Sequence, residues 1–533
     1  MEETIRIKEL LCRAQSGESL WLPELRRRFE ADGGAYRAIV RLVGENSVRD
    51  YPLSFPRAED AEDMNFLLRY AAANVYNILS AFSGREIKIF CGDELRALLA
   101  PLPEMFDAPD GMGKVRNIAR RIHGSFRICF APEEEYASAG VEKTPAAADL
   151  GERLLALCKE AEGKNCAGVD IGGSDIKLAV SAKGRLLYTK EYDWNPAASP
   201  TAEGILDPIL ALIREAKERI AEAGGTLDAV GISFPDIVIA DRIVGGETPK
   251  TKAMRENTAL DYEREFAKLR ELRSLVLPLC VPGGEVRLTN DGNMAAFTAA
   301  VELAAGGETE RIRSGVIAHS LGTDLGTGWL RADGTIPAFP LEMYDLLLDL
   351  GDLPSAALPP EDLRSSRNEN SGMNGVRRYL GQAAAYRLAW KLDEKLLDGF
   401  CARKGERLFI PTSPVDQRKP CLEHLMHEAS QGNAAAEEIF RTIGENLSFV
   451  TREMQWLFGD TPPSRILFGR FVKSRRCFEL LCEGFEKGKT GVTLLTADED
   501  LANTALMKQL AAAPGVTVAQ FAQAVGSIFY ALT

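Results

Sequence analysis

The chain has 533 residues, and its 64 basic and 77 acidic side chains give a net charge of −13. An acidic balance argues against a nucleic-acid partner, because both surfaces would carry negative charge. The sequence contains no run of 18 apolar residues that would cross a bilayer and no signal-peptide pattern at its start. Its ten cysteines include no Cys-x-x-Cys pair, which is typical of reduced thiols, so we expect a cytoplasmic protein without a membrane partner.

The first 150 residues are predicted to form an α+β module of unknown role. Residues 5–30 have helical periodicity, residues 36–53 favour strands, residues 61–82 favour one long amphipathic helix, and residues 86–91 favour a strand followed by a helix. An acidic stretch with Ala and Pro, residues 132–149, marks the end of this module. Gly113 and Lys114 lie in a short Gly-Met-Gly-Lys segment that hints at a phosphate loop, but the spacing is wrong and a plain turn is favoured.

Residues 166–180 carry the most informative pattern of the chain. Two apolar runs, residues 167–171 and 176–180, are predicted strands, and between them lie two glycines and a hydroxyl. Such a turn lets backbone N–H groups surround an anion. A tight hairpin without a ligand would have the same composition, so this pattern alone leaves both interpretations open.

Three further segments follow in chain order. Residues 229–235 form an apolar strand ending in Gly, Ser and Pro. Residues 286–300 predict a short strand that delivers Asn290 and Asp291 to the start of a helix. Residues 315–330 predict a second hairpin rich in Gly and Thr.

Together the four segments resemble the sugar-kinase, hexokinase and actin superfamily and, within it, the ROK family. The segment beginning at Asp170 is similar to the family's first phosphate hairpin, Asp-Ile-Gly-Gly-Thr followed by Lys. The segment beginning at Asn290 is similar to Asn-Asp-Ala-Asn-Ala-Ala-Ala, and the segment beginning at Gly322 to Gly-Thr-Gly-x-Gly-x-Gly. The resemblance covers about residues 165–342 and does not touch residues 1–160.

The resemblance implies a two-lobed, ribonuclease-H-like α/β fold of the actin and hexokinase type, with the α+β module added at its N-terminus. The first lobe is expected at residues 163–308 and the second at residues 309–533, with a C-terminal helix, residues 518–532, returning to the first lobe. ROK repressors carry a winged helix-turn-helix before this fold, but no recognition helix is evident after Glu30. We therefore do not expect DNA binding.

The resemblance also implies roles for individual residues. Asp291 is the expected catalytic base, although an Asp at the start of a helix is also a preferred N-cap. Asp170 is expected to organise Mg²⁺ and the phosphates of ATP, and Asn290, Asp291 and Glu342 are expected to bind the acceptor. The expected ATP- and phosphate-binding residues are Asp170, Gly172, Gly173, Ser174, Lys177, Gly322, Thr323, Asp324, Gly326 and Gly469. For Lys177, a solvated strand position is the alternative.

The chain departs from the family pattern at several positions. Asp345 stands where a zinc-binding His is expected, and the following cysteine positions hold Ser371 and Val376, so no zinc site is predicted. Asp324 replaces a glycine in the second phosphate hairpin, where a carboxylate about 4 Å from a phosphate charge would cost roughly 4 kcal/mol. The side chain points away, or Mg²⁺ lies between, or the pocket does not take ATP. Only Gly469 remains of a Gly-Gly pair expected beside adenosine.

The sequence thus predicts an ATP-dependent phosphotransferase of the sugar-kinase type that acts on a hexose or amino-sugar hydroxyl, with a homodimer as one candidate assembly. Its small-molecule partners are a sugar and a nucleotide. A catalytically impaired protein that binds sugar or nucleotide and has a regulatory role is the competing prediction, favoured by Asp324 and the altered zinc segment. An ATPase acting on another partner through the N-terminal module is a third.

Overall fold

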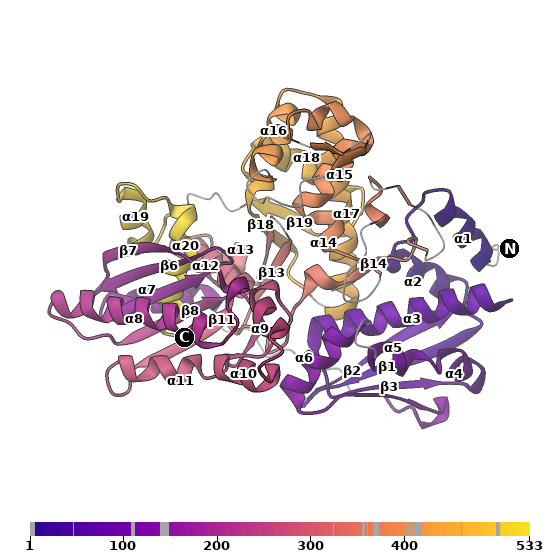
Figure 1. Cartoon of the computed structure of the whole chain (residues 1–533), viewed down its shortest axis with the longest axis horizontal. Coiled ribbons are helices and arrows are strands. Elements are labelled where there is room, and N and C mark those ends of the chain that lie inside the picture. The colour runs from indigo at the N-terminus through magenta and orange to yellow at the C-terminus, as the bar shows by residue number, and fades with distance from the viewer. Residues whose placement is uncertain are drawn as a thin grey trace.

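The computed structural model describes residues 6–45, 47–107, 112–138, 149–322, 324–353, 358–359, 361–365, 373–400, 402–404, 407–409, 418–459, 461–496 and 501–533. Figure 1 shows three parts. A mixed α/β lobe lies at the left, a second lobe with many helices lies at the centre and top, and an N-terminal α+β module lies at the lower right.

The first lobe is built on a five-stranded sheet of order β11-β8-β5-β6-β7. Strand β5 (Asn165–Ile171) pairs antiparallel with β6 (Asp175–Ala182), which pairs antiparallel with β7 (Arg185–Asp193). On its other side β5 pairs parallel with β8 (Ala229–Phe234), which pairs parallel with β11 (Glu285–Asn290). The predicted strands on both sides of the first hairpin are therefore confirmed.

The second lobe repeats this arrangement. Strand β12 (Gly315–Leu321) pairs antiparallel with β13 (Leu325–Arg331) and parallel with β18 (Ser464–Phe468), which pairs parallel with β19 (Thr493–Thr496). In each sheet an antiparallel hairpin is thus followed by two parallel strands. The two predicted phosphate hairpins are the equivalent turns of the two repeats, which confirms a two-lobed α/β architecture.

Helices cover both faces of the first sheet. Helices α8 (Glu203–Glu222), α10 (Tyr262–Leu269) and α11 (Leu272–Val276) share one core with it, and α7 (Leu150–Ala161), α12 (Asp291–Ala305) and α20 (Val518–Tyr530) form the core on its other face. Gly168 and Gly231 let α20 approach closely, since a β-carbon on either would lie 1.8 Å from a carbonyl oxygen of the helix. The C-terminal helix therefore packs on the first sheet.

The N-terminal module contains a four-stranded sheet of order β2-β1-β3-β4. Its strands are β1 (Tyr36–Val43), β2 (Val48–Phe55), β3 (Glu86–Cys91) and β4 (Arg127–Ala131). The helices are α1 (Ile7–Gln15), α2 (Leu22–Ala31), α3 (Ala61–Phe82), α4 (Asp93–Leu99), α5 (Leu102–Asp107) and α6 (Gly113–His123). The predicted helix at residues 61–82 has these bounds, and its second half is buried throughout, so the helix lies in the core of the module.

The N-terminal module and the second lobe share one hydrophobic core. Trp21 of the module stacks on Phe449 with ring centroids 4.3 Å apart, and Phe82 packs edge-on against Phe458 at 4.9 Å. Both partners lie on α17 (Ala434–Phe458), the longest helix in the described part of the second lobe. The module is thus packed as an extension of the second lobe.

The second lobe also contains shorter helices and strands. They are α13 (Thr309–Ile312), β14 (Leu347–Asp349), β15 (Asn374–Gly375), α14 (Arg377–Leu380), α15 (Gln382–Leu392), β16 (Ala402–Lys404), β17 (Arg407–Phe409), α16 (Arg418–Ser430) and α18 (Arg475–Glu486). Helix α19 (Ala505–Ala512) lies beside α20 and β7. Short 3-10 turns complete the chain, of which Pro249–Thr251 and Met343–Asp345 matter for the site.

Residues 351–374 connect β14 to β15 and are described only in part. In the described part of residues 351–374, Arg364 is buried and donates to the carbonyls of Ala14 and Glu18. Arg364 thus packs this segment against the end of α1. Residues 139–148 of the predicted linker lie outside the described residues. Within the described ranges, no helix is both long and apolar enough to cross a membrane.

Candidate active site

The turn of the first hairpin is closed by its own backbone and by Trp194. The N–H of Gly172 donates to the carbonyl of Asp175 at 2.8 Å, and Trp194 donates its backbone N–H to Ser174 and its indole N–H to Gly172, both at 3.1 Å. A β-carbon on Gly173 would meet only Cε of Lys250, 3.9 Å away, and both Gly173 and Ser174 are exposed. The turn is therefore a fixed loop with an open face.

Two of the predicted phosphate ligands in this hairpin contact a neighbouring acid. Lys177 forms an ion pair with Asp175, and the hydroxyl of Ser174 donates to the same carboxylate at 3.0 Å. Lys177 is also the cross-strand partner of Asp170. Lys177 is thus half-buried in an ion pair and not a solvated strand residue. Asp175, which the sequence analysis overlooked, balances its charge.

Asp170 lies near the end of β5 and points toward the neighbouring strand. Its carboxylate accepts a hydrogen bond of 2.8 Å from the hydroxyl of Ser233 on β8. Burial raises the pKa of Asp170 to about 6, with a further contribution from the negative charge of Asp291, while Ser233 and Lys177 oppose the rise. The carboxylates of Asp170 and Asp291 are therefore close enough to influence each other, as their common site requires.

The Asn-Asp-Gly-Asn segment at the start of α12 divides its roles among four residues. Asn290 is the N-cap, since its side chain accepts from the N–H of Gly292 at 2.9 Å and donates to the carbonyl of Asp236 at 3.0 Å. Asn293 accepts from the backbone N–H of Trp329 on β13 at 3.0 Å. The N-cap interpretation considered for Asp291 is therefore wrong, because the neighbouring Asn290 caps the helix.

Asp291 stands at the first position of the helix with its carboxylate half-buried. Burial raises its pKa, and the positive charge of Lys250 and the N–H of Gly292 oppose that rise. A carboxylate with a raised pKa in a partly dry site has the basicity that proton abstraction from a hydroxyl needs. The geometry leaves Asp291 available for chemistry.

The second hairpin docks on the start of α12. A β-carbon on Gly328 would lie 1.8 Å from the carbonyl oxygen of Gly292, and one on Gly292 would lie 2.3 Å from that of Thr327. Glycine is thus required at both positions for close packing between the lobes. Gly326 faces the side chain of Ser320 across the hairpin, with an added β-carbon 3.3 Å from it. The hairpin turn is held by donation from Gly322 to Asp324 at 3.2 Å and from Gln382 to Gly322 at 3.0 Å.

Asp324 is turned toward a cation of its own lobe. Its carboxylate lies 3.6 Å from the guanidinium of Arg377 on α14, and its side chain is 44% exposed. Of the outcomes considered for this acid, the structure favours a side chain directed to a protein partner. Thr323, the adjacent predicted phosphate ligand, lies outside the described residues.

Gly469 follows β18 and lies against the base of the second hairpin. Its φ of 95° favours glycine. A β-carbon there would lie 2.3 Å from the carbonyl oxygen of Leu321. The fold therefore requires this glycine whether or not it contacts adenosine, and its role in nucleotide binding stays a prediction.

Glu342 lies in a buried cluster of charges. Its carboxylate is 3.8 Å from Nζ of Lys114, which also pairs with Asp345 and donates to the hydroxyl of Tyr344 at 3.2 Å. Arg377 lies 3.7 Å from the second oxygen of Asp345. We call Lys114, Glu342, Tyr344, Asp345 and Arg377 the acidic-pair cluster. Lys114 comes from α6, so the phosphate-loop interpretation of its segment is not supported.

Burial raises the pKa of Glu342 to about 7, with Lys114 opposing the rise and Asp345 adding to it. Although burial lowers the pKa of Lys114, the carboxylates of Asp345 and Glu342 raise it overall. The backbone of Glu342 is fixed by the N-terminal module, since Leu341 and Glu342 donate to the carbonyls of Ala81 and Ser80 at 3.0 and 3.1 Å. Leu341 adopts a φ of 56°, which is uncommon for a non-glycine residue and often marks a functional site.

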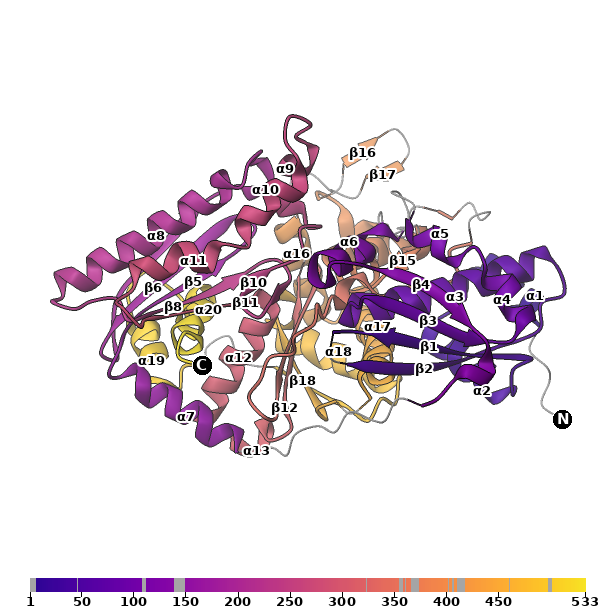
Figure 2. The same ribbon diagram turned by 90° about the horizontal axis from the view of Figure 1, so that it is seen from below.

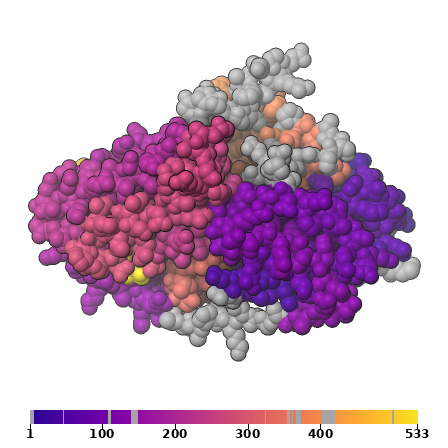
Figure 3. Space-filling view, turned by 60° about the horizontal axis from the view of Figure 1, so that its bottom comes forward, coloured from indigo at the N-terminus to yellow at the C-terminus, as the bar shows by residue number. Residues whose placement is uncertain are grey.

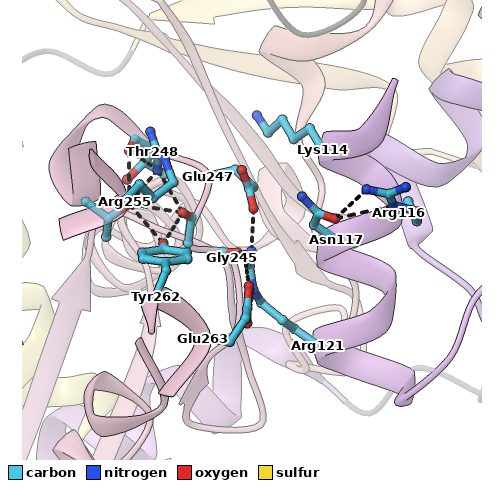
Figure 4. Close-up of polar contacts among 12 residues, drawn as sticks. Lys114, Arg116, Asn117, Arg121, Gly245, Glu247, Thr248, Arg255, Tyr262 and Glu263 are labelled. Carbon is cyan, nitrogen blue, oxygen red and sulfur yellow. Dashed lines mark hydrogen bonds and ion pairs between the residues drawn. The ribbon is translucent and has the colours of Figure 1, made fainter. Parts of the chain in front are cut away.

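Helix α6 also reaches the first lobe. Figure 4 shows Arg121 extending from α6 to the loop at Gly245 and to Glu247 and Glu263. Its ion pair with Glu247 is 2.7 Å long, and its side chain is only 4% exposed. Lys114 projects from the other end of the same helix face toward the space between the lobes. In the view from below (Figure 2), α6 lies between α10 and the N-terminal sheet.

The donor set permits magnesium bound mainly through nucleotide. In the described part of the chain, no three His, Cys, Asp or Glu side chains are grouped closely enough to hold a metal ion. Asp170 supplies a hard carboxylate oxygen, and Mg²⁺ commonly takes one or two carboxylates, with phosphates and water completing its shell. Asp170 thus fits the predicted role. The absence of a zinc site remains a prediction, because Ser371 and its neighbours lie outside the described residues.

No family model and no curated protein matches this sequence. The chain is similar to a ROK family glucokinase from Streptomyces griseus in complex with glucose and AMPPNP, with 20% identity, a TM-score of 0.43, and coverage of 69% of this chain and 99% of that one. For a ROK hexokinase from Thermus thermophilus the identity is 18% and the TM-score 0.42, with coverage of 69% of this chain and 98% of that one. For a ROK family transcriptional regulator, a homologue of the E. coli MLC protein, the identity is 13% and the TM-score 0.41, with coverage of 69% of this chain and 81% of that one. TM-scores below 0.5 establish neither the family nor the activity of this chain.

Proposed function

We propose that this protein is an ATP-dependent phosphotransferase that phosphorylates a hydroxyl of a sugar-type acceptor, with Asp291 as the general base. One observation carries the proposal: Asp170 and Asp291 lie together at the ends of β5 and β11, beside two equivalent Gly-rich hairpins from two repeated sheets. Asn290 is the N-cap of α12, although one oxygen of Asp291 also accepts the N–H of Gly292 at 2.9 Å.

The two hairpins supply the nucleotide side of the site. Backbone N–H groups in Gly-rich turns bind phosphate oxygens, and an open turn face is available at Gly173 and Ser174. Asp170 would hold Mg²⁺ against the phosphates, and the metal would neutralise negative charge there. Ser233 orients Asp170 through its 2.8 Å hydrogen bond.

Asp291 acts on the acceptor. It removes the proton of the attacking hydroxyl while that oxygen bonds to the terminal phosphorus of ATP. The bond between this phosphorus and the bridging oxygen breaks, and ADP leaves with the electron pair. The base must be ionised before the step, so its raised pKa sets a lower pH limit for activity and increases its affinity for the proton.

Glu342 and Asn290 are proposed to orient the acceptor. The negative charge of Asp236 adds to the raised pKa of Glu342, and the backbone carbonyl of Asp236 accepts a hydrogen bond from Asn290. The two lobes therefore present these groups to a common region. Because Nζ of Lys114 lies 3.8 Å from Glu342, a hydroxyl bound there would also contact the N-terminal module.

The competing function is a regulatory binding protein without turnover. It is favoured by the acidic-pair cluster, in which Lys114 already occupies the carboxylates that would bind a hydroxyl. It is also favoured by the engagement of Lys177 and Ser174 with Asp175. A protein of this class would bind sugar or nucleotide but would not transfer phosphate.

The decisive experiment measures ADP release with ATP, Mg²⁺ and a panel of hexoses and amino sugars. For the wild type we expect turnover with at least one acceptor, and Asp291→Asn should lower kcat on the order of a hundredfold or more while nucleotide still binds. Asn293→Asp is unsuitable as a control because Asn293 holds β13, whereas Asp261→Asn changes an N-cap carboxylate on exposed α10 and should leave kcat unchanged. Nucleotide binding without turnover on any acceptor would support the regulatory alternative, and equal turnover by Asp291→Asn would remove Asp291 from the mechanism.

A further inference from the structure

We propose that Lys250 binds the phosphoryl group while it is transferred, as a cation that the 245–257 loop delivers to the site. The proposal rests on the phosphotransferase function proposed above and adds a residue to it. The sequence motifs gave no indication of Lys250, because it lies in a loop without a recognisable pattern.

The position of Lys250 is the first argument. It lies in the short Pro249–Thr251 turn, and a β-carbon on Gly173 would be 3.9 Å from its Cε. Its charge also acts on the carboxylates of Asp291 and Asp236. The side chain of Lys250 therefore lies beside the open turn of the first hairpin, and its charge reaches the proposed base. A phosphoryl group that passes from ATP to an acceptor would cross this region.

The second argument is that the charge of Lys250 is available. Within the described residues, Lys177 is paired with Asp175, Arg377 with Asp324 and Asp345, and Lys114 with Asp345. Lys250 forms no ion pair and no hydrogen bond with any residue that the structure describes, and its side chain is half-buried. A partly desolvated ammonium that forms no ion pair is suited to an anionic ligand.

The third argument is that the loop is rigid. The carbonyl of Gly246 accepts hydrogen bonds from Thr251 at 3.0 Å and Arg255 at 2.8 Å, and also from the hydroxyl of Tyr262. The buried carboxylate of Asp236 accepts from the N–H of Gly246 at 2.8 Å. Figure 4 shows these contacts converging on the loop from several sides.

The N-terminal module completes this support. Arg121 of α6 bonds to the carbonyl of Gly245 and pairs with Glu247, so the loop is fixed from outside the first lobe as well. The space-filling view (Figure 3) shows the surfaces of the module and of the first lobe meeting. A charge that is positioned before the reaction stabilises developing charge without reorganisation cost. Arg121 is therefore a positioning residue for Lys250.

The chemistry assigned to Lys250 is electrostatic. During transfer, negative charge spreads over the three non-bridging oxygens of the phosphoryl group, and one ammonium beside them stabilises that state. Lys250 exchanges no proton and forms no covalent bond, so the balance of the step is unchanged: the proton goes to Asp291 and the electron pair to ADP. Because ATP carries the terminal phosphoryl group and ADP does not, Lys250 should distinguish the two nucleotides.

The test compares Lys250→Met with Lys252→Met, a charge removal two residues away. Lys252 is the matched control because its side chain is 62% exposed and lies 3.9 Å from Glu256 at the surface. For Lys250→Met we expect kcat to fall on the order of a hundredfold, as for loss of one donor to a transition state. Lys252→Met should match the wild type, and Lys250→Arg should recover part of the rate because it keeps the charge.

A binding measurement that needs no acceptor completes the test. The affinity for ADP with Mg²⁺ and aluminium fluoride, a mimic of the phosphoryl group in flight, should fall at least tenfold in Lys250→Met, while the affinity for ADP alone should change less than twofold. Equal loss for both ligands would mean that Lys250 only supports the loop, and no loss for either would also overturn the proposal. If the wild type transfers phosphate and Lys250→Met does so equally well, the proposal for Lys250 is refuted while the phosphotransferase function stands. If the wild type binds no nucleotide, the proposed phosphotransferase function is itself refuted, and the proposal for Lys250 with it.

Discussion

The acidic-pair cluster makes a quantitative prediction about stability. Replacing Lys114 by Met keeps an unbranched side chain of similar length but removes the cation that faces Glu342 and Asp345. Lys114 is 4% exposed at its side chain, so water cannot readily replace the lost ion pairs. Of the ion pairs that Glu342 and Asp345 form in this cluster, only that of Asp345 with Arg377, at 3.7 Å, would then remain.

The magnitude follows from the distances. Two unit charges 3.8 Å apart, as for Lys114 and Glu342, interact by about 4 kcal/mol at an effective dielectric near 20. Removing one partner of a buried ion pair generally costs about 3–5 kcal/mol, because an uncompensated charge remains. We therefore expect Lys114→Met to lower the free energy of unfolding of the core shared by the module and the second lobe by about 3–5 kcal/mol.

The loss should depend on pH. Burial raises the pKa of Glu342 from its ordinary value of 4.5 to about 7, so this group stabilises the fold below pH 4.5 and loses that contribution as pH rises to about 7. Without Lys114 the folded pKa rises further, and stability should continue to fall above pH 7. The difference between mutant and wild type should thus be larger at pH 8 than at pH 6.

Urea unfolding followed by tryptophan fluorescence at pH 6 and pH 8 measures both effects, since Trp21 and Trp456 lie in the shared core. Lys88→Met is the control, because Lys88 is 33% exposed and lies 3.9 Å from Glu135, so its loss should cost less than about 1 kcal/mol. Lys114→Met combined with Asp345→Asn should recover part of the stability. A cost below 1 kcal/mol that is equal at both pH values would show that the cluster is solvated and would refute the reasoning.

The remaining predictions concern ligands. Asp324→Gly frees Arg377 for the nucleotide, so the affinity for Mg²⁺ and ATP should rise a few-fold by calorimetry, whereas weaker binding would show that Asp324 acts through the metal. Because the pKa of Asp170 is about 6, the affinity for Mg²⁺ and ATP should fall as pH drops through 6, and Asp170→Asn should abolish this dependence between pH 5 and 7.5. Elemental analysis should find well under one zinc per chain, and a chelator should leave the melting temperature unchanged; one zinc per chain would show that the region after Glu342 binds metal.

Local sequence determined the elements and the outline of the site. Apolar runs on both sides of Gly172 and Gly173 are enough to specify a hairpin, and the strand that ends at Asn290 must deliver Asp291 to a helix start. The bounds of α3 also followed from the sequence, with Asp60 as its N-cap. These features depend on contacts between residues close along the chain.

Only the tertiary structure decided which residues surround the site. Ion pairs such as Lys114 with Asp345 and Arg121 with Glu247 join residues more than a hundred positions apart, and no periodicity encodes them. The same holds for the core that the module shares with the second lobe, since Trp21 meets Phe449 only after both are folded. Whether Asp291 or Asn290 caps α12 could not be chosen from composition, because both side chains are good caps and the outcome depends on where Asp236 lies. Hydrophobic patterning fixes which face of an element is buried, but the partner across that face is set by how the whole chain packs.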